Sequence, residues 1–590
     1  MNLVDSFKPR TPALVERFAI VRGAPKTLAF GNPRFTDATL AAEAARLGTA
    51  AAWQLAFQRF GRAAPAHVEG DFAVALRDGA GDVFLAVDRF AIRSLCYRCD
   101  GDDLMVAERA DDVAGSAAID PQAIYDYLYF HVIPAPRTIF AGVSRLSAGT
   151  QVTFDKNGIE ESRWWMPKFV EDESRPFPQL RDEFRTVLRD SVARSLVPGI
   201  TGCFLSGGTD SSTVAGMLRD VTGEAPHTFS IGFDADGYDE MAFARIAARH
   251  FGTRHHEYYL TADDIVASVP KIAVFYDQPF GNSSVVPAYR CAMLARDCGV
   301  EQILAGDGGD ELFGGNVRYA KQTLFELYSK VPGALRRGIV ERVFNERTQL
   351  ANVRPFSKVV SYITQAKTPL PDRMQMYNLL TRLGPQQLFR PEFLGRVDVH
   401  GPAVQQRRVF AAVAAKSLVN RMLGYDWKYT LADTDLPKVM GATSLAGIET
   451  GFPFLDDRVV DFSLRLEPSY KLKGLKLRWF FKEALRGYLP DEILAKQKHG
   501  FGLPYGAWLV RGGPLLDMTV SSLESLAGRG IVSQEFLKLL IRDLLPSAPG
   551  YYGELVWILM MLEQWWSSHE GRRVNSGDRF GFTSATPTSL

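Results

Sequence analysis

The sequence is poor in cysteine and in net charge, and both shortages exclude classes of protein. Five cysteines among 590 residues cannot form a paired disulfide framework, so we expect a reducing compartment, the cytoplasm. A formal net charge of +1 provides no basic surface for nucleic acid and no polybasic patch for a membrane. We therefore expect neither partner.

Long apolar runs are also scarce. The first residues lack the apolar core of a signal peptide, and the most apolar run, 555–562, lies between Glu554 and Glu563. It is too short to cross a bilayer and predicts a buried helix. A hydrophobic fraction of 46% and a charged fraction of 23% are typical of a globular protein. The length is too great for a single core and predicts two domains.

The most informative stretch is Ser206–Ser212, with the sequence SGGTDSS. An apolar run precedes it and a helical pattern follows it, so the chain reads strand, glycine loop, helix. Glycines let a backbone approach a ligand closely, and a helix amino terminus attracts anions. Asp210 would repel a phosphate unless it carried a cation, which favours Mg²⁺. A serine-rich turn that caps a helix is the alternative, but the density of glycines, hydroxyls and a carboxylate favours a phosphate loop.

Apolar strands alternate with amphipathic helices after this loop. We predict strands over 228–233, 256–260 and 302–305, and helices over 239–251 and 285–297. This alternation is typical of a parallel sheet covered on both faces, in which ligands bind at the carboxyl ends of the strands. A second glycine-rich and acidic cluster, 306–315, follows the last of these strands. Alone it could be a solvated turn; beside Asp210 it supplies a second carboxylate.

The rest of the chain gives a coarser picture. Residues 1–165 contain short apolar runs at 70–76, 83–87 and 95–97, which predict strands joined by polar turns. The proline-rich segment 166–179 predicts a linker before the second domain, 180–569. Residues 318–430 read as helices without an interpretable motif, and the polar tail 570–590 is expected to be disordered.

The glycine loop resembles the pyrophosphate loop of the N-type ATP pyrophosphatases, and the surrounding chain is similar to the asparagine synthetase family over roughly residues 60–565. Gly70–Ala73 and Asp88–Arg93 match strands of that family's amino-terminal glutaminase domain, and Gln497–Gly502 matches its catalytic lysine loop. The resemblance implies an α+β sandwich of the Ntn-hydrolase type over 1–165. It implies an α/β parallel-sheet domain of the adenine nucleotide α-hydrolase type, with extra helices, over 180–569.

The resemblance also implies a reaction and its residues. A carboxylate attacks ATP to give an acyl-adenylate and Mg-pyrophosphate, and an amine then displaces AMP. The implied cofactors are ATP and Mg²⁺. The residues implied are Phe204, Ile231, Ala305 and Gly306 for adenosine; Ser206, Gly207, Gly208, Ser211 and Ser212 for pyrophosphate; Asp210 and Asp310 for the metal; and Lys498, Asp307 and Glu449 for catalysis.

Two departures from the family pattern bear on the substrate. The family begins Met-Cys-Gly and uses the cysteine to take ammonia from glutamine, whereas this sequence begins Met1-Asn2, and Asn2 offers no thiolate. We therefore expect the glutaminase chemistry to be lost. Met440, Gly441 and Gly451 replace polar family residues beside the amino-acid substrate.

These departures most resemble the lasso-peptide macrolactam synthetases, which join a peptide's amino terminus to an Asp or Glu side chain. The expected partners are then a precursor peptide or small carboxylate, with a leader protease and a leader-binding protein. One alternative is an asparagine synthetase homologue that uses free ammonia or amidates a small metabolite or glycan. Another is a degenerate ATP-binding scaffold, against which the presence of Asp210, Asp310 and Lys498 argues.

Overall fold

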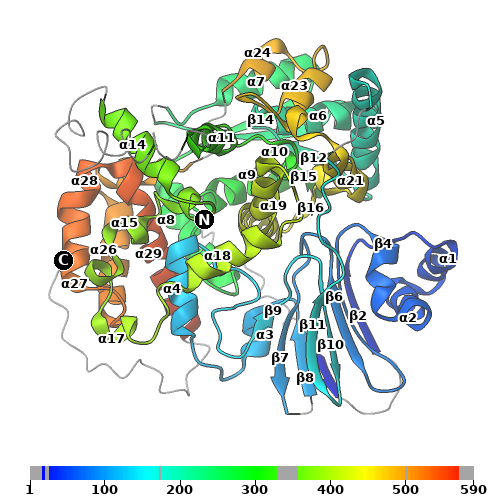
Figure 1. Ribbon diagram of the computed structural model, residues 1–590, viewed down its shortest axis with the longest axis horizontal. Coiled ribbons are helices and arrows are strands. Elements are labelled where there is room, and N and C mark those ends of the chain that lie inside the picture. The colour runs from blue at the N-terminus through cyan, green and yellow to red at the C-terminus, as the bar shows by residue number, and fades with distance from the viewer. Residues whose placement is uncertain are drawn as a thin grey trace. The chain divides into compact units, whose positions relative to one another are not determined.

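The protein is described from a computed structural model, shown in Figure 1. The structure describes residues 16–19, 26–101, 103–171, 175–235, 237–329, 332, 336, 356–497 and 502–570. Met1, Asn2, Lys498 and all of the predicted tail after Glu570 lie outside these residues. The chain forms two compact units. Among the described residues, unit 1 contains those up to Met166, the segment Ala273–Phe280 and the segment from Trp565 to Glu570; unit 2 contains those in Pro167–Ile272 and Gly281–Gln564.

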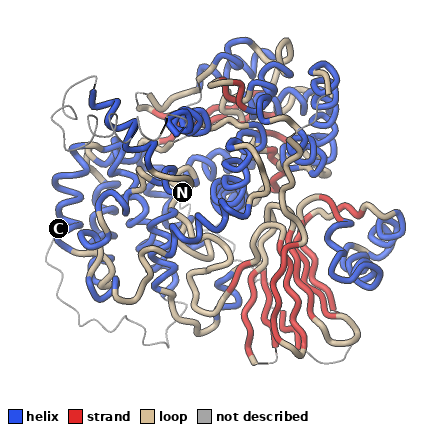
Figure 2. Tube along the Cα trace, in the orientation of Figure 1, coloured by secondary structure: helices blue, strands red, loops and turns tan. Residues whose placement is uncertain are grey.

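Unit 1 is built on two antiparallel sheets, which are red in Figure 2. The five-stranded sheet has the order β11-β10-β6-β5-β2, with strands Gly158–Arg163, Thr150–Asp155, Val83–Val87, Phe72–Arg77 and Lys26–Gly31. The four-stranded sheet has the order β1-β8-β7-β9, with strands Glu16–Ala19, Asp103–Ala107, Cys96–Asp100 and Ser144–Arg145. The remaining elements are β3 (Arg34–Phe35), β4 (Val68–Glu69), α1 (Ala38–Leu47), α2 (Thr49–Phe60), α3 (Ala110–Ala114) and α4 (Pro121–Phe130).

Alternation along β5 explains the layers of unit 1. Ala73 lies in a buried cluster with Leu104 of the four-stranded sheet. Its neighbour Val74 faces the other way, into a cluster with Trp53 of α2. Successive side chains of a strand point to opposite faces, so one face of the five-stranded sheet packs on the second sheet and the other on helices. Unit 1 is an α+β sandwich, and the strands predicted over 70–76, 83–87 and 95–97 correspond to β5, β6 and β7.

Unit 2 is built on a five-stranded parallel sheet. Its order is β14-β13-β12-β15-β16, with strands Arg254–Leu260, His227–Phe233, Thr201–Phe204, Gln302–Leu304 and Glu449–Gly451. Phe204 of β12 lies beside Phe229 of β13, and Cys203 lies beside Leu304 of β15. The predicted strands are present, but the sequence did not predict β16, whose three residues include an exposed glutamate.

Helices surround the parallel sheet (Figure 1). α5 (Phe177–Ser195) packs on α6 (Thr209–Thr222), and α9 (Val285–Asp297) packs on α20 (Leu436–Ala446). The other longer helices are α7 (Met241–Phe251), α8 (Ala262–Phe275), α11 (Val317–Ser329), α14 (Phe356–Lys367), α18 (Gly401–Ala412), α19 (Leu418–Asp426), α21 (Asp457–Arg465), α26 (Pro514–Gly528) and α29 (Pro549–Glu570). A π-helical segment, Trp427–Asp435, joins α19 to α20.

The short elements of unit 2 are α10 (Gly309–Phe313), α15 (Leu379–Leu383), α16 (Pro385–Leu388), α17 (Pro391–Leu394), α22 (Pro468–Lys471), β17 (Leu472–Lys473), β18 (Lys476–Leu477), α23 (Trp479–Ala484), α24 (Asp491–Ala495), α25 (Tyr505–Leu509), α27 (Gln534–Leu539) and α28 (Leu545–Ser547). The apolar run 555–562 is buried within α29, as predicted. Among the described helices, none combines the length and apolarity that a membrane span requires.

Candidate functional site

The glycine loop connects β12 to α6 at the carboxyl edge of the parallel sheet. Gly207 has a φ of +66°, and a Cβ on it would lie 2.4 Å from the backbone nitrogen of Ala244 in α7. Both the left-handed backbone and the close approach require glycine. The Ser206 amide donates to Ser211 Oγ (3.1 Å), and the Gly208 amide donates to Ser206 Oγ (3.3 Å). The hydroxyls of Ser206 and Ser211 therefore fix the shape of the loop.

Ser212 differs from the other two serines. Its amide donates to the carbonyl oxygen of Gly208 (3.1 Å) as part of the first turn of α6. The residue is completely buried, and its Oγ has no hydrogen-bond partner among the residues that the structure describes. The predicted pyrophosphate ligands Ser206 and Ser211 thus line the loop, whereas the Ser212 side chain lies beneath it.

The second glycine-rich cluster, 306–315, places the carboxylate of Asp310 near that of Asp210 in the glycine loop. Arg478 Nη1 donates to Asp210 Oδ2 (2.7 Å) and to Asp310 Oδ1 (2.8 Å), and Nη2 also contacts Asp210. Glycines make room for both carboxylates: a Cβ at Gly309 would lie 2.2 Å from Asp210 Oδ1, and one at Gly315 would lie 1.6 Å from Asp310 Oδ1. The two predicted metal ligands therefore converge on a single point, which an arginine nitrogen occupies.

This arrangement fits a magnesium ion that accompanies a nucleotide. Because one atom lies within 2.8 Å of both carboxylates, one cation can contact both. In the described part of the chain no group of three or more His, Cys, Asp or Glu converges as a metal site. Phosphate oxygens and water would complete the coordination, which is the usual way that Mg²⁺ is bound beside a polyphosphate.

Asp307 lies next to this pair in a charged environment. Lys438 Nζ of α20 lies 3.8 Å from Asp307 Oδ1 and 2.8 Å from Asp435 Oδ1. Burial raises the pKa of Asp307 to about 6, although the Lys438 cation opposes that rise. A carboxylate with this pKa is ionised at neutral pH yet accepts a proton readily, as a general base requires.

The residues predicted for adenosine lie along the same edge of the sheet. Phe204 ends β12, and Ala305 follows β15, where its amide donates to the carbonyl of Gly451 (2.9 Å). A Cβ on Gly306 would lie 3.0 Å from the amide nitrogen of Ser211, so the two loops are in contact. Ile231 lies in β13, two residues beyond the partner of Phe204. The four residues belong to three adjacent strands, β13, β12 and β15, or to the residues that directly follow them.

Of the three predicted catalytic residues, Asp307 alone is placed in this cluster. Glu449 begins β16 and pairs with Gln302, at the amino end of the strands, whereas Asp307 follows their carboxyl ends. The parallel register therefore separates Glu449 from Asp307 instead of bringing them together. Lys498 lies outside the described residues.

Sequence reasoning missed two cations at the site. Arg478 follows the β17–β18 hairpin and precedes α23, and the sequence around it gave no signal of a site. Lys496 lies two residues before Lys498; its Nζ is 3.1 Å from Glu240 Oε2 and donates to the carbonyl of Ser206 (3.3 Å). Burial lowers the pKa of Lys496, and Glu240 opposes this. Its place directly before the lysine loop was the signal that could have found it.

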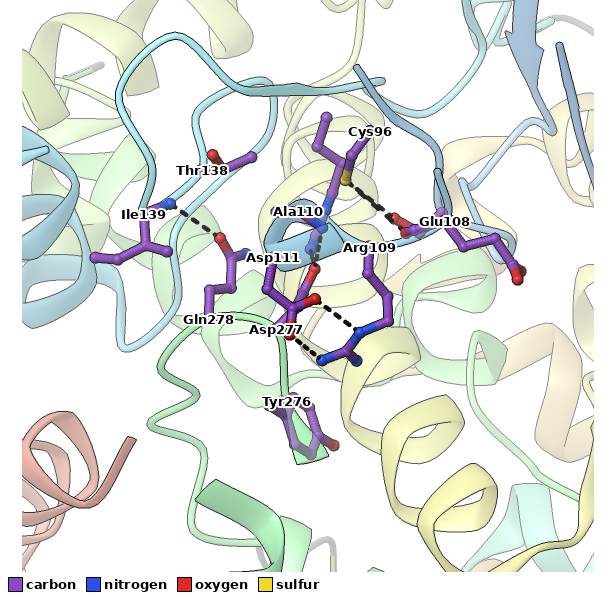
Figure 3. A network of polar contacts seen from close by, with 12 residues as sticks. Cys96, Glu108, Arg109, Ala110, Asp111, Thr138, Ile139, Tyr276, Asp277 and Gln278 are labelled. Atoms are coloured by element: carbon purple, nitrogen blue, oxygen red, sulfur yellow. Dashed lines mark hydrogen bonds and ion pairs between the residues drawn. The ribbon is translucent and has the colours of Figure 1, made fainter. Parts of the chain in front are cut away.

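Unit 1 contains a buried charge network, shown in Figure 3. The carboxylate of Asp277 accepts from the amide of Ala110 (2.9 Å) and from Arg145 (2.6 Å). Burial acts to raise the pKa of Asp277, but the nearby Arg145 and Arg109 cations outweigh it and hold the pKa at about 2. The Ile139 amide donates to Gln278 Oε1 (3.3 Å). Ala273–Phe280 is thus fixed within unit 1 by charge and hydrogen bonds.

Each of the five thiols in the sequence has a pKa that burial raises. Burial raises the pKa of Cys96 to about 11 and that of Cys203 to about 12, and it also raises those of Cys99, Cys291 and Cys298. A nucleophilic cysteine requires a lowered pKa, because the thiolate is the reactive form. All five cysteines of the sequence are described, so the result applies to each of them.

The chain is similar to several known proteins. The chain is 29% identical over 479 residues to a putative glutamine-hydrolyzing asparagine synthetase of Mycobacterium tuberculosis, covering 78% of this chain and 70% of that protein. It is 26% identical over 436 residues to a glutamine-hydrolyzing asparagine synthetase of Bacillus subtilis, covering 72% and 66%. A putative enzyme of the same name from Methanocaldococcus jannaschii is 33% identical over 271 residues, covering 43% and 51%.

Two family models also match. The glutamine amidotransferase domain model covers residues 53–165, and the asparagine synthase model covers residues 183–567, which is more than half of the chain. The carboxylate pair, the glycine loop and the parallel sheet that supports them all lie in the larger match. The chain therefore belongs to the asparagine synthase family of amide-forming ligases.

Proposed function

We propose that the protein uses ATP to activate a carboxylate as an acyl-adenylate and couples it to an amine that does not come from glutamine. The convergence of Asp210 and Asp310 beside the glycine loop carries the proposal. The amino terminus of α6 and the backbone of Gly207 and Gly208 would bind the pyrophosphate. Asp210 and Asp310 would hold Mg²⁺, which supplies charge neutralisation at the departing pyrophosphate.

Asp307 would remove the proton from the incoming amine. Its pKa of about 6 leaves it ionised at neutral pH, and Lys438 restrains its carboxylate from one side. Lys498 is proposed, from the resemblance, to stabilise the negative charge that grows in the transition state.

We further propose a lasso precursor peptide as the substrate, with its amino terminus closing on an Asp or Glu side chain. Two observations support it. None of the five thiols is activated for glutamine hydrolysis. In addition, Gly451 occupies a position where asparagine synthetases carry arginine, and a Cβ there would lie 2.7 Å from Leu304 Cδ2, so a larger residue would require Leu304 to move. A leader protease and a leader-binding protein would be the partners.

The experiment supplies substrates of both kinds to the purified protein. A peptide with a free amino terminus and an internal aspartate should yield AMP and a product lighter by one water, measured by chromatography and mass spectrometry. The same peptide with an acetylated terminus, or with asparagine for aspartate, should give no cyclic product. Asparagine formed from free aspartate and ammonia would favour the ammonia-using homologue instead. If none of the tested carboxylates gave AMP, the result would contradict ligase activity altogether.

A further inference from the structure

Arg478 lies where a metal ion between Asp210 and Asp310 would lie. Its side chain is only 6% exposed, and Nη1 donates to Thr209 Oγ1 (3.0 Å) as well as to both carboxylates. One guanidinium therefore pairs with both predicted metal ligands and offsets one of their two negative charges. A guanidinium and a divalent cation cannot share this position, since both are positive and both need the same oxygens.

The backbone and the surrounding rings hold Arg478 in place. Its φ of +52° is left-handed, which is rare for a residue with a side chain and persists only where the surroundings impose it. Its amide donates to the carbonyl of Lys471 (2.8 Å) beside the β17–β18 hairpin, and its guanidinium carbon lies 4.0 Å from the ring centre of Phe481. The position of the cation is therefore built into the fold.

The guanidinium also retains a donor for a ligand. Arg478 Nε is buried and finds no hydrogen-bond partner within the described ranges. A buried unpaired donor is costly, and an incoming acceptor atom relieves that cost. The oxygens of a polyphosphate are suitable acceptors, because arginine pairs well with them and the glycine loop lies beside Asp210.

We propose that Arg478 is the resident cation of the nucleotide site and makes it selective for metal–nucleotide over bare metal. Bare Mg²⁺ must displace Arg478 from the carboxylates and offers it no new partner. The metal–ATP complex displaces it too, but supplies phosphate oxygens that receive the guanidinium. This role rests on the proposed metal site of Asp210 and Asp310 and is independent of which acceptor is joined.

The test compares binding of Mg²⁺ alone with binding of MgATP, by titration calorimetry and thermal unfolding, without any carboxylate substrate. Arg478→Met removes the charge but keeps much of the side chain's bulk. We expect the variant to bind bare Mg²⁺ about tenfold or more tightly than the native protein, because a charged hydrogen-bonded competitor is gone. We expect it to bind MgATP about tenfold more weakly, because the phosphate partner is lost. Mg²⁺ alone should raise the unfolding temperature of the variant and leave that of the native protein nearly unchanged.

Controls separate this role from simple structural loss. Arg486→Met removes an exposed arginine paired with Glu483 and should change neither affinity. Arg478→Lys keeps a cation without the planar fork, should fold, and should give intermediate values for both ligands. Unchanged or weaker binding of bare Mg²⁺ to Arg478→Met, or unchanged MgATP binding, would overturn the proposal. If the gain in affinity for bare Mg²⁺ persisted in the double variant Arg478→Met/Asp310→Asn, the metal would bind elsewhere. That result would refute the proposed metal site itself.

Discussion

Two carboxylates that share one cation make Asp210 and Asp310 the most sensitive residues of the site. Asp210→Asn and Asp310→Asn each remove one negative charge from the position that we assign to magnesium. ATP–pyrophosphate exchange should fall by about a hundredfold or more, because metal-assisted neutralisation supplies several kcal/mol to such transition states. Circular dichroism should remain native-like. Exchange at the native rate in either variant would show that the residue does not hold the metal.

Asp307 should matter for the second half of the reaction only. If it takes the proton from the amine, Asp307→Asn should leave ATP–pyrophosphate exchange nearly intact and slow amide formation by about 10²–10⁴-fold, the usual contribution of a general base. The two rates are measured separately, by exchange of labelled pyrophosphate and by product mass. An equal loss in both would assign Asp307 to adenylation instead.

Lys471 gives unit 2 a stability that depends on pH. The residue is 1% exposed, and its Nζ donates to Asn420 Oδ1 (2.9 Å). Burial lowers its pKa from 10.5 to about 7. Between about pH 7 and 10.5 the unfolded chain binds more protons at this group than the folded chain does, so its contribution to stability rises with pH. Below pH 7 the full penalty of a buried charge is present.

Lys471→Met should therefore raise the free energy of unfolding at pH 7, by about 1–3 kcal/mol. The difference from the native protein should shrink as the pH approaches 10, and calorimetry at several pH values measures it. The exposed neighbour Lys473 provides the control, since Lys473→Met relieves no buried charge. A lower unfolding temperature for Lys471→Met at every pH would contradict the argument.

At the scale of elements, the acidic loop depends on glycines that leave room for its own carboxylate. A methyl group at Gly315 would fall 1.6 Å from Asp310 Oδ1, so Gly315→Ala must displace that carboxylate. We expect exchange activity to fall as far as in Asp310→Asn while the fold survives. Gly528→Ala is the matched control, because a Cβ there meets nothing within 4 Å. Full activity in Gly315→Ala would mean that the Asp310 position is not critical.

The elements also show what sequence can and cannot predict. Apolar runs predicted β5, β6, β13 and β15, and the helix predicted over 285–297 is α9 with the same bounds, because burial dictates those patterns. The strand β16 was not predicted because its residues, Glu449–Gly451, do not form an apolar run, unlike those of the equally short β15. Arg478 escaped because it is one of 68 lysines and arginines, and it meets Asp210 across 268 residues of chain. Local patterns contain no trace of such a contact.

For the molecule as a whole, the state of its thiols predicts how it obtains an amine. Glutamine hydrolysis by a cysteine requires a thiolate, and burial raises the pKa of every cysteine in the sequence. Purified protein incubated with glutamine should release no glutamate above the background rate, measured with a coupled dehydrogenase assay. Product formation should depend instead on an added amine. Glutamate release at the rate of an active amidotransferase would overturn this expectation.

The segment Ala273–Phe280 affects how this protein can be divided or recombined. It enters the sequence more than a hundred residues after Met166, yet its Asp277 is the counter-ion of the half-buried Arg145. A gene fragment that stops at Met166 would encode Arg145 without that carboxylate, and removing one partner of a largely desolvated ion pair disfavours folding. The amino-terminal segment up to Met166 is therefore not an exchangeable module. A chimera that joins this segment to the rest of a relative must also include Ala273–Phe280. Otherwise the relative must itself provide a carboxylate where Asp277 lies.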